Sequence, residues 1–286
     1  MKVAGAPISW GVCEVPGWGF QLEPDRVLRE MVEVGLTATE FGPQGWLPEA
    51  PAARASVLAD AGLAAVGAFV PVLLHVAEHD PLPGLDAELD AFDAAGGDVL
   101  VLAAATGTDG YDARPELSAD EWDRLLRNLD RLAIHARSRG ITPSLHPHVG
   151  TLVESFADVT RVLDGTGVPL CLDTGHLLIG GTDPAELTRA HAERISHVHA
   201  KDVRADLAAQ VQSGALSYTD AVRAGMYVPL GDGDVDLPAI VSALTAVDFD
   251  GWWVLEQDTI LQTEPEGEGP VADVRRSLDH LRSLSS

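Results

Sequence analysis

Two apolar segments of the chain end in acidic residues that could bind a metal ion. The run that begins at Pro169 continues into Leu172-Asp-Thr-Gly-His176, so Asp173 and His176 stand together directly after it. The run Trp252-Trp-Val-Leu is followed by Glu256. An unpaired buried carboxylate is costly, so Glu256 needs a metal or another cation as its partner. Asp173 has a second interpretation, because an Asp after a strand is also a common helix N-cap.

A third segment carries two imidazoles and an amine at the spacing of a strand. It reads Ile195-Ser-His-Val-His-Ala-Lys201. Alternate side chains of a strand share one face, so His197, His199 and Lys201 are expected to point the same way. Imidazole and carboxylate ligands together suit Mn²⁺, Co²⁺, Mg²⁺ or Zn²⁺. A strand histidine such as His197 is also compatible with a supporting position in the core.

Two further segments end in candidate site residues. Leu145 is followed by His146-Pro-His148 with Glu154 a little further on, and Thr39 is followed by Glu40. A carboxylate or a histidine from the first of these segments would complete a metal site. Taken alone, Glu154 is better explained as an acid that opens a helix, where the helix dipole favours it.

These segments belong to a regular alternation of strands and helices. Near-continuous apolar runs such as VGAFVPV are typical of strands covered on both faces, as in a parallel sheet. Eight strand–helix units over residues 1–286 predict a single (β/α)8 TIM barrel of the α/β class, and no G-x-G-x-x-G turn follows the first strand to favour a doubly wound sheet. We expect strands over Val3 to Trp10, Ala38 to Gly42, Ala64 to Val72, Val99 to Ala104, Thr142 to His148, Pro169 to Asp173, Ile195 to Ala200 and Trp252 to Glu256, with helices including Pro24 to Val34, Glu121 to Arg139, Ser155 to Leu163, Leu237 to Ala246 and Val271 to Leu284.

In a barrel enzyme the carboxyl ends of the strands and the loops after them form the active site. The acids and histidines described above would therefore converge at one mouth of the barrel. Trp10 and His75 follow the first and third strands and are expected to line the pocket. The longest interruption, residues 202–236, would lie on the same face and could cover it.

Charge and composition exclude some classes of protein. The chain has 44 acidic and 19 basic residues and a net charge of −25, which disfavours binding to nucleic acid and to anionic membranes. No apolar run approaches the length of a membrane span, and no signal peptide is apparent. Two cysteines do not make a disulfide framework. We expect a cytoplasmic protein without a membrane or nucleic-acid partner.

The motifs resemble those of the xylose isomerase-like TIM-barrel superfamily of sugar phosphate isomerases and epimerases, over nearly the whole chain. The similarity is greatest to the inosose dehydratase branch. The matching stretches are Ala6-Pro-Ile-Ser-Trp10, Thr39-Glu-Phe-Gly42, His146-Pro-His-Val-Gly-Thr151, Leu172-Asp-Thr-Gly-His176, His197-Val-His-Ala-Lys-Asp-Val-Arg204 and Val228-Pro-Leu-Gly-Asp-Gly233.

The resemblance implies a single divalent ion, with Mn²⁺ or Co²⁺ favoured. It implies Asp173, His199 and Glu256 as ligands, with Glu154 preferred as the fourth and His146 as the alternative. Glu154 or Glu256 would serve as the base, with His176 and Lys201 as proton donors or oxygen stabilisers. The implied substrate is a small polyol or sugar, contacted by Trp10, Glu40, His75, His146, His148 and His197.

The expected chemistry is proton abstraction next to a carbonyl. If the resulting enolate expels a β-hydroxyl group, the enzyme is a dehydratase such as an inosose dehydratase. If the enolate is reprotonated, the enzyme is an isomerase or epimerase. A sugar-binding barrel without activity and an AP endonuclease-type nuclease are less favoured alternatives, and relatives often form homo-oligomers.

Overall fold

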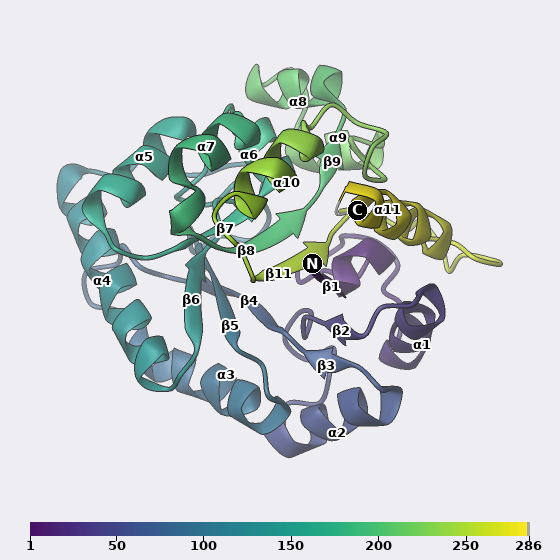
Figure 1. Cartoon of the computed structure of the whole chain (residues 1–286). Coiled ribbons are helices and arrows are strands. Elements are labelled where there is room, and N and C mark those ends of the chain that lie inside the picture. The colour runs from purple at the N-terminus through teal and green to yellow at the C-terminus, as the bar shows by residue number, and fades with distance from the viewer. Residues whose placement is uncertain (285–286) are drawn as a thin grey trace.

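A ring of parallel strands forms the centre of the molecule, and helices surround it (Figure 1). The computed structural model describes residues 1–284. The sheet runs in the order β3-β2-β1-β11-β8-β7-β6-β5-β4. Its strands are β1 (Lys2–Gly5), β2 (Ala38–Thr39), β3 (Ala64–Ala65), β4 (Gly67–Val72), β5 (Val99–Ala104), β6 (Thr142–Leu145), β7 (Leu170–Asp173), β8 (Ile195–Ala200) and β11 (Trp252–Leu255).

β3 and β4, the two ends of this strand order, follow each other in the chain with one residue between them. Val66 separates β3, which pairs with β2, from β4, which pairs with β5. The Val66 N–H donates to Thr39 O at 2.9 Å, and Val66 O accepts from the Asp98 and Val99 N–H groups. Gly67 allows this close approach, because a Cβ there would lie 1.8 Å from Val99 O. β3 and β4 are thus two parts of one expected strand, and the predicted TIM barrel is confirmed.

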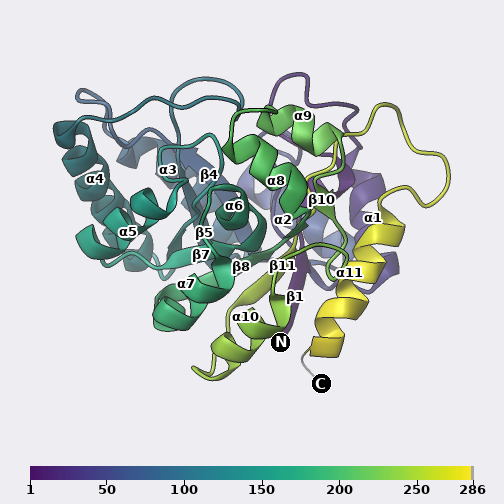
Figure 2. The ribbon, with the colours of Figure 1, turned by 90° about the horizontal axis from the view of Figure 1, so that it is seen from above.

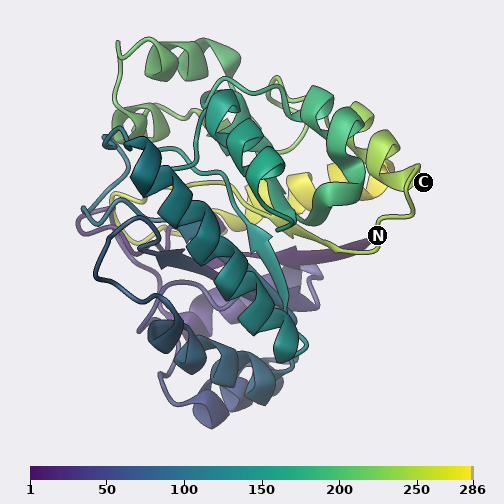
Figure 3. The same ribbon diagram turned by 90° about the vertical axis from the view of Figure 1, so that its left-hand side faces the viewer.

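The outer helices pack on the ring through their apolar faces. They are α1 (Pro24–Val34), α2 (Pro51–Ala61), α3 (Leu82–Ala95), α4 (Ala119–Ser138), α5 (Phe156–Gly165), α6 (Thr174–Ile179), α7 (Pro184–His191), α10 (Leu237–Thr245) and α11 (Val271–Leu284). Capping residues fix several starts: Ser118 and Ser155 form capping boxes with Glu121 and Asp158, and Asp183 caps α7. In Figure 3, α4 lies along the outside of the barrel.

Alternation along the strands separates two apolar layers. Leu100 and Leu102 of β5 pack outward with the helices, whereas Val99 and Val101 belong to a small inner cluster. That inner cluster consists mainly of small residues from successive strands: Ala4, Ala6, Ala38, Val66, Val99, Val101, Cys171 and Val254. Small side chains leave the remaining inner positions at the carboxyl ends of the strands free for polar groups.

The first strand is shorter than expected. β1 ends at Gly5, and Pro7–Trp10 forms a 3-10 helix in place of the expected continuation to Trp10. Pro7 has no N–H to donate to a ladder, and its fixed φ suits the first position of a helix. This turn directs the loop that follows over the mouth of the barrel.

An insertion between β8 and α10 covers part of that mouth, as the sequence predicts. It contains β9 (Asp202–Val203), α8 (Ala205–Gln212), α9 (Tyr218–Arg223) and β10 (Tyr227–Val228), and β10 pairs antiparallel with β9. Figure 2 shows α8 and α9 at one end of the barrel and both chain termini at the opposite end. Among residues 1–284, no helix is long and apolar enough to cross a membrane.

Candidate active site

The inward positions of five strands supply the polar groups of the site. Beyond the inner apolar residues Ala38, Cys171 and Val254, the next inward positions two residues on are Glu40, Asp173 and Glu256. Alternation likewise turns His197 and His199 of β8 inward while Val198 packs among the helices. His146 follows β6 in the same way. These six side chains are at most 8% exposed.

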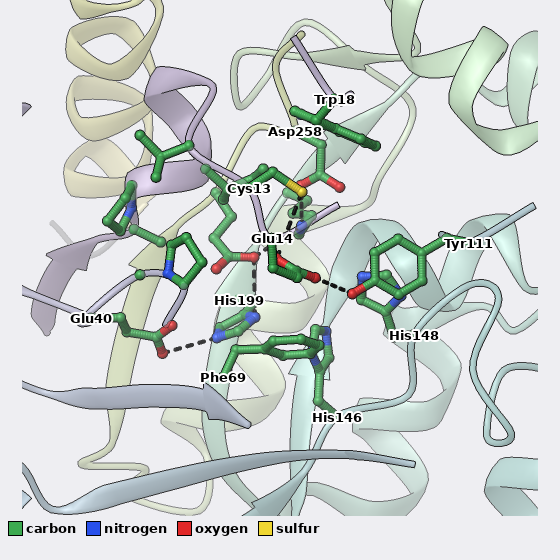
Figure 4. Close-up of a pocket in the computed structure, with 18 residues that line it drawn as sticks. Cys13, Glu14, Trp18, Glu40, Phe69, Tyr111, His146, His148, His199 and Asp258 are labelled. Atoms are coloured by element: carbon green, nitrogen blue, oxygen red, sulfur yellow. Dashed lines mark hydrogen bonds and ion pairs between the residues drawn. The ribbon is translucent and has the colours of Figure 1, made fainter. Parts of the chain in front are cut away.

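Glu40 orients both histidines of β8. Its Oε1 lies 2.9 Å from His197 Nε2 and 3.1 Å from His199 Nε2. Figure 4 draws the contact with His199 as a dashed line. An ionised carboxylate only accepts, so both histidines carry a proton on Nε2. Burial opposes the charge on Glu40, but His199 and His197 hold the pKa of Glu40 well below its usual value. A carboxylate behind a histidine in this manner fixes the ring for metal binding.

The other nitrogen of His199 faces two carboxylates. His199 Nδ1 lies 3.1 Å from Glu256 Oε2 and 3.6 Å from Asp173 Oδ2, yet it has no hydrogen-bond partner of acceptable geometry. When the ring is neutral, its one proton stays on Nε2, and Nδ1 presents a lone pair toward oxygen atoms that also only accept. A cation between these atoms would satisfy all three. This is the arrangement that a divalent ion requires, and the residues fit one.

His146 completes the group. His146 Nε2 lies 3.0 Å from Asp173 Oδ2, and His146, Asp173 and His199 each offer a ligand atom within 4.8 Å of the others'. Burial lowers the pKa of His146. Burial opposes the charge on Asp173, but Lys201 and His176 lower its pKa well below the usual value. Both groups are therefore in the protonation state that metal binding needs.

Asp173 has both of the functions that its sequence position allows. Its Oδ1 accepts from the His176 N–H at 2.7 Å and caps α6, while Oδ2 faces His146 and His199. The N-cap bond fixes the carboxylate at the start of a helix. The orientation of the proposed ligand is thus determined by the local backbone.

Lys201 lies next to the same carboxylates. Its Nζ is 2.9 Å from Glu256 Oε2 and 3.7 Å from Asp173 Oδ2, and it also pairs with Asp258. Burial opposes the ammonium charge, but Asp258 and Glu256 raise the pKa of Lys201 well above its usual value. His199 and Lys201 in turn hold the pKa of Glu256 low, against the effect of burial.

Glu154, the fourth ligand preferred from the sequence, lies outside this cluster, whereas the alternative His146 lies in it. The Glu154 carboxylate accepts from the Gly150 N–H at 2.8 Å and pairs with Arg114 at 3.3 Å. It precedes Ser155, the N-cap of α5, and the partly exposed side chain is directed to these partners. The structure places His146, at the end of β6, beside Asp173.

Two expected pocket residues also lie elsewhere. The Trp10 indole is fully buried and donates to Glu30 at 2.8 Å, so it packs in the core. His75 lies on the loop after β4, where its carbonyl accepts from Arg124. Neither lines the cavity at the barrel mouth. His197, a third expected substrate contact, does not line the cavity either and bonds to Glu40. His176 stacks on His148 with ring centroids 3.7 Å apart.

The cavity lies above the cluster and is walled by loops. Glu40, His146, His148, His199, Lys201 and Glu256 line it together with Phe69 and Trp18. Figure 4 shows Glu14, from the loop after β1, bonded to the Tyr111 hydroxyl. Tyr111 also packs on His148, with centroids 4.2 Å apart. The bond between Glu14 and Tyr111 joins two loops across the cavity.

Sequence reasoning did not identify Tyr111, Asp258 or Tyr218 as site residues. Asp258 follows Glu256 by two positions, and this strand-like spacing was the available signal. Tyr111 and Tyr218 come from irregular segments, so no periodicity points to them. The positions of both tyrosines in the site depend on tertiary contacts.

The site and barrel together define a β/α-barrel enzyme with a buried carboxylate–histidine cluster. The family model for the xylose isomerase-like TIM barrel matches residues 28–284, and the chain belongs to this family. The expected family is thereby confirmed.

The similar proteins include dehydratases. The chain is 35% identical over 301 residues to "Rhizopine catabolism protein MocC" of Rhizobium meliloti, covering 100% of this chain and 89% of that protein. It is 34% identical over 275 residues to the inosose dehydratase of Geobacillus kaustophilus (strain HTA426), covering 90% and 87%. These relatives confirm the prediction of an enzyme, a lyase or an isomerase/epimerase.

Solved structures show the same fold. An IOLI protein with a bound zinc atom has a TM-score of 0.72 at 15% identity and covers 99% of both chains. An L-ribulose 3-epimerase has a TM-score of 0.70 at 17% identity, covering 99% of this chain and 95% of its own. At such identities the similarity concerns the fold alone.

Proposed function

We propose that this protein is a metal-dependent dehydratase of a small keto-polyol, of the inosose class. The observation that carries the proposal is that His199 Nδ1, without a well-aligned hydrogen bond, faces the acceptor oxygens of Asp173 and Glu256. The inosose dehydratase among the similar proteins supports the choice of substrate.

We propose His146, Asp173, His199 and Glu256 as the residues that hold one divalent ion. Two imidazoles and two carboxylates favour Mn²⁺ or Co²⁺, with Mg²⁺ and Zn²⁺ as alternatives. When bound, the ion supplies Lewis-acid stabilisation of the substrate oxygen that gains charge as the carbon next to the carbonyl loses its proton.

Glu256 and Lys201 form the proton-transfer pair of the proposal. Glu256 accepts the proton from the carbon, since the neighbouring cations keep it ionised. Lys201, which is protonated at neutral pH, donates to the departing β-hydroxyl group, which leaves as water. The 2.9 Å contact between Lys201 Nζ and Glu256 Oε2 lets the abstracted proton return to the amine.

The charge of the cavity supports an uncharged substrate. Its lining holds four acidic residues, Glu14, Glu40, Glu256 and Asp258, and one lysine, Lys201. Lys201 is already surrounded by carboxylates. A phosphate or carboxylate on the substrate would meet an excess of negative charge. A neutral polyol would instead donate its hydroxyl protons to these acceptors.

Elimination is favoured over epimerisation by the number of free bases. Epimerisation by proton transfer needs a group on each face of the carbon. Among the described residues of the cluster, Asp173 is engaged by the α6 N-terminus, which leaves Glu256 as the available carboxylate base beside the Lys201 donor. Because Lys201 contacts Glu256, the acid and the base lie on one side of the site, an arrangement that suits loss of water better than proton exchange between opposite faces of the carbon.

The test is incubation of the protein with 2-keto-myo-inositol and Mn²⁺ or Co²⁺. The expected result is growth of an ultraviolet absorbance from the dehydrated product, abolished by EDTA and restored by the metal. Interconversion of ketoses without that absorbance would assign the chain to the epimerases. Metal-independent turnover would contradict the proposed mechanism.

We further propose a cytoplasmic location. Cys13 and Cys171 are both free thiols, the state that a reducing compartment maintains.

A further inference from the structure

Asp258 is a buried carboxylate whose two oxygens are held by different elements. It follows β11, lines the cavity and is 7% exposed. Oδ1 pairs with Lys201 Nζ at the end of β8. Oδ2 accepts the Tyr218 hydroxyl at 2.5 Å. Asp258 therefore connects the Lys201 amine to α9.

Tyr218 belongs to the insertion that covers the barrel mouth. It is the first residue of α9, whose N-cap is Ser217, and it is 2% exposed. The α9 start is further fixed by the Thr219 N–H, which donates to Asp112 Oδ1 at 2.8 Å. The Tyr218 hydroxyl also lies 3.1 Å from the Tyr227 hydroxyl of β10. The insertion thus holds its phenol against Asp258 by contacts on several sides.

The position of Lys201 matters because its amine could neutralise the metal ligands. Without Asp258, the nearest carboxylates of Lys201 would be Glu256 at 2.9 Å and Asp173 at 3.7 Å. An ammonium drawn onto these oxygens would compete with a divalent ion for them. Asp258 provides a counter-charge outside the proposed ligand set, closer to Lys201 than either of the two ligand carboxylates.

We propose that Asp258, held by Tyr218 of the insertion, is a positioning residue that shares the Lys201 amine with Glu256 and Asp173 and so limits its competition with the metal ion for these two carboxylates. The inference rests on the proposed function for the part that Lys201 takes in turnover. Its effect on metal binding stands apart from turnover, because it concerns the protein and the ion alone.

The test is a double-mutant cycle read out by Mn²⁺ titration of metal-stripped protein. Asp258→Asn should weaken Mn²⁺ binding about tenfold, in the range seen for groups that orient metal ligands. In a Lys201→Met background the same change should alter Mn²⁺ affinity less than about twofold, because the amine that competes is gone. A merely electrostatic effect of the lost negative charge would persist in both backgrounds, and that result would overturn the proposal.

Tyr218→Phe gives a second test that changes no charge and does not depend on Lys201→Met folding. Loss of one hydrogen bond should weaken Mn²⁺ binding about threefold in the same direction and lower kcat more than it changes KM. Asp220→Asn, at an exposed position of α9 where the side chain pairs with Arg223, is the matched control and should leave both unchanged. Mn²⁺ affinity equal to that of the wild type in Tyr218→Phe and Asp258→Asn would refute the inference. Absence of keto-polyol turnover in the wild type would refute only the proposed function.

Discussion

The Nε2 atom of His199 lies 3.1 Å from Glu40 Oε1, and this contact determines which nitrogen of His199 faces the other carboxylates. Glu40→Gln should therefore weaken Mn²⁺ binding about 10- to 100-fold, since the amide holds the ring and its proton less firmly. Calorimetric titration of metal-stripped protein measures the change. Glu30→Gln is a control, because Glu30 is a buried carboxylate bonded to Trp10 and Arg26 outside the cavity. Equal losses in both variants would indicate a general effect on folding.

His146 and Glu154 can be separated as ligands by paired substitutions. His146→Ala should lower Mn²⁺ affinity by about 10-fold or more, because one ligand of the ion is lost. Glu154→Gln should leave Mn²⁺ affinity unchanged and cost at most about 1 kcal/mol of stability, the usual range for a partly exposed ion pair. Metal titration and urea unfolding of the two variants provide the measurements. The reverse order of affinities would restore Glu154 as the ligand.

Metal binding should strengthen as the pH rises. Burial alone would lower the pKa of His199, but Cys171, Glu256 and Glu40 raise it well above its usual value, so the metal-free ring carries an extra proton at neutral pH. An ion must displace that proton, which gives a gain in affinity of about tenfold per pH unit below the His199 pKa. Titrations between pH 6 and 8, at about one-unit steps, test the slope. A flat profile would mean that His199 binds the ion without losing a proton.

The same pKa shift affects the stability of the metal-free protein. A pKa that is raised on folding stabilises the folded state fully below the unfolded value of 6.5, and this contribution declines as the pH rises toward the folded pKa. In EDTA, the contribution of His199 should therefore fall by about 1.4 kcal/mol per pH unit above that value. The free energies of unfolding of wild type and His199→Gln, measured with urea at each pH, isolate the contribution of His199. A difference in the free energy of unfolding between the two proteins that stays constant with pH would contradict the raised pKa of His199.

Asp202 should be essential to the insertion. Its carboxylate accepts four backbone N–H groups, from Val203, Gly231, Gly233 and Val235, at 2.8–3.0 Å. Asp202→Ala leaves these donors without their acceptor and should cost about 3 kcal/mol or more, because unsatisfied buried donors are expensive. Urea unfolding measures the loss. Asp206→Ala, an exposed acid in α8, is the control and should stay within about 0.5 kcal/mol of the wild type.

Strand periodicity explains how much of the site the sequence could predict. Asp173, His199 and Glu256 follow apolar runs at inward positions, and the period of two fixes their direction once a barrel is assumed. The same rule favours His146, which continues the inward face of Ser144 on β6. Glu154 lies beyond the strand, where direction depends on a turn and on Arg114, a partner distant in sequence. No local pattern encodes that contact.

Loop residues were harder to place for the same reason. Tyr111 reaches the cavity because its loop contacts Glu14 from the β1 loop, and Gly150 permits the close approach of the Tyr111 backbone. Trp10 was expected in the pocket because a continuous strand was expected there. The turn at Pro7 instead directs the indole toward Glu30.

The most direct test of the account is the location of the ion in crystals of the protein grown with Mn²⁺. Anomalous scattering from manganese should give one peak per chain, within about 2.3 Å of His199 Nδ1 and of oxygens of Asp173 and Glu256, with His146 as a further ligand. A peak between Glu40 and His197, or at Glu154 and Arg114, would contradict it.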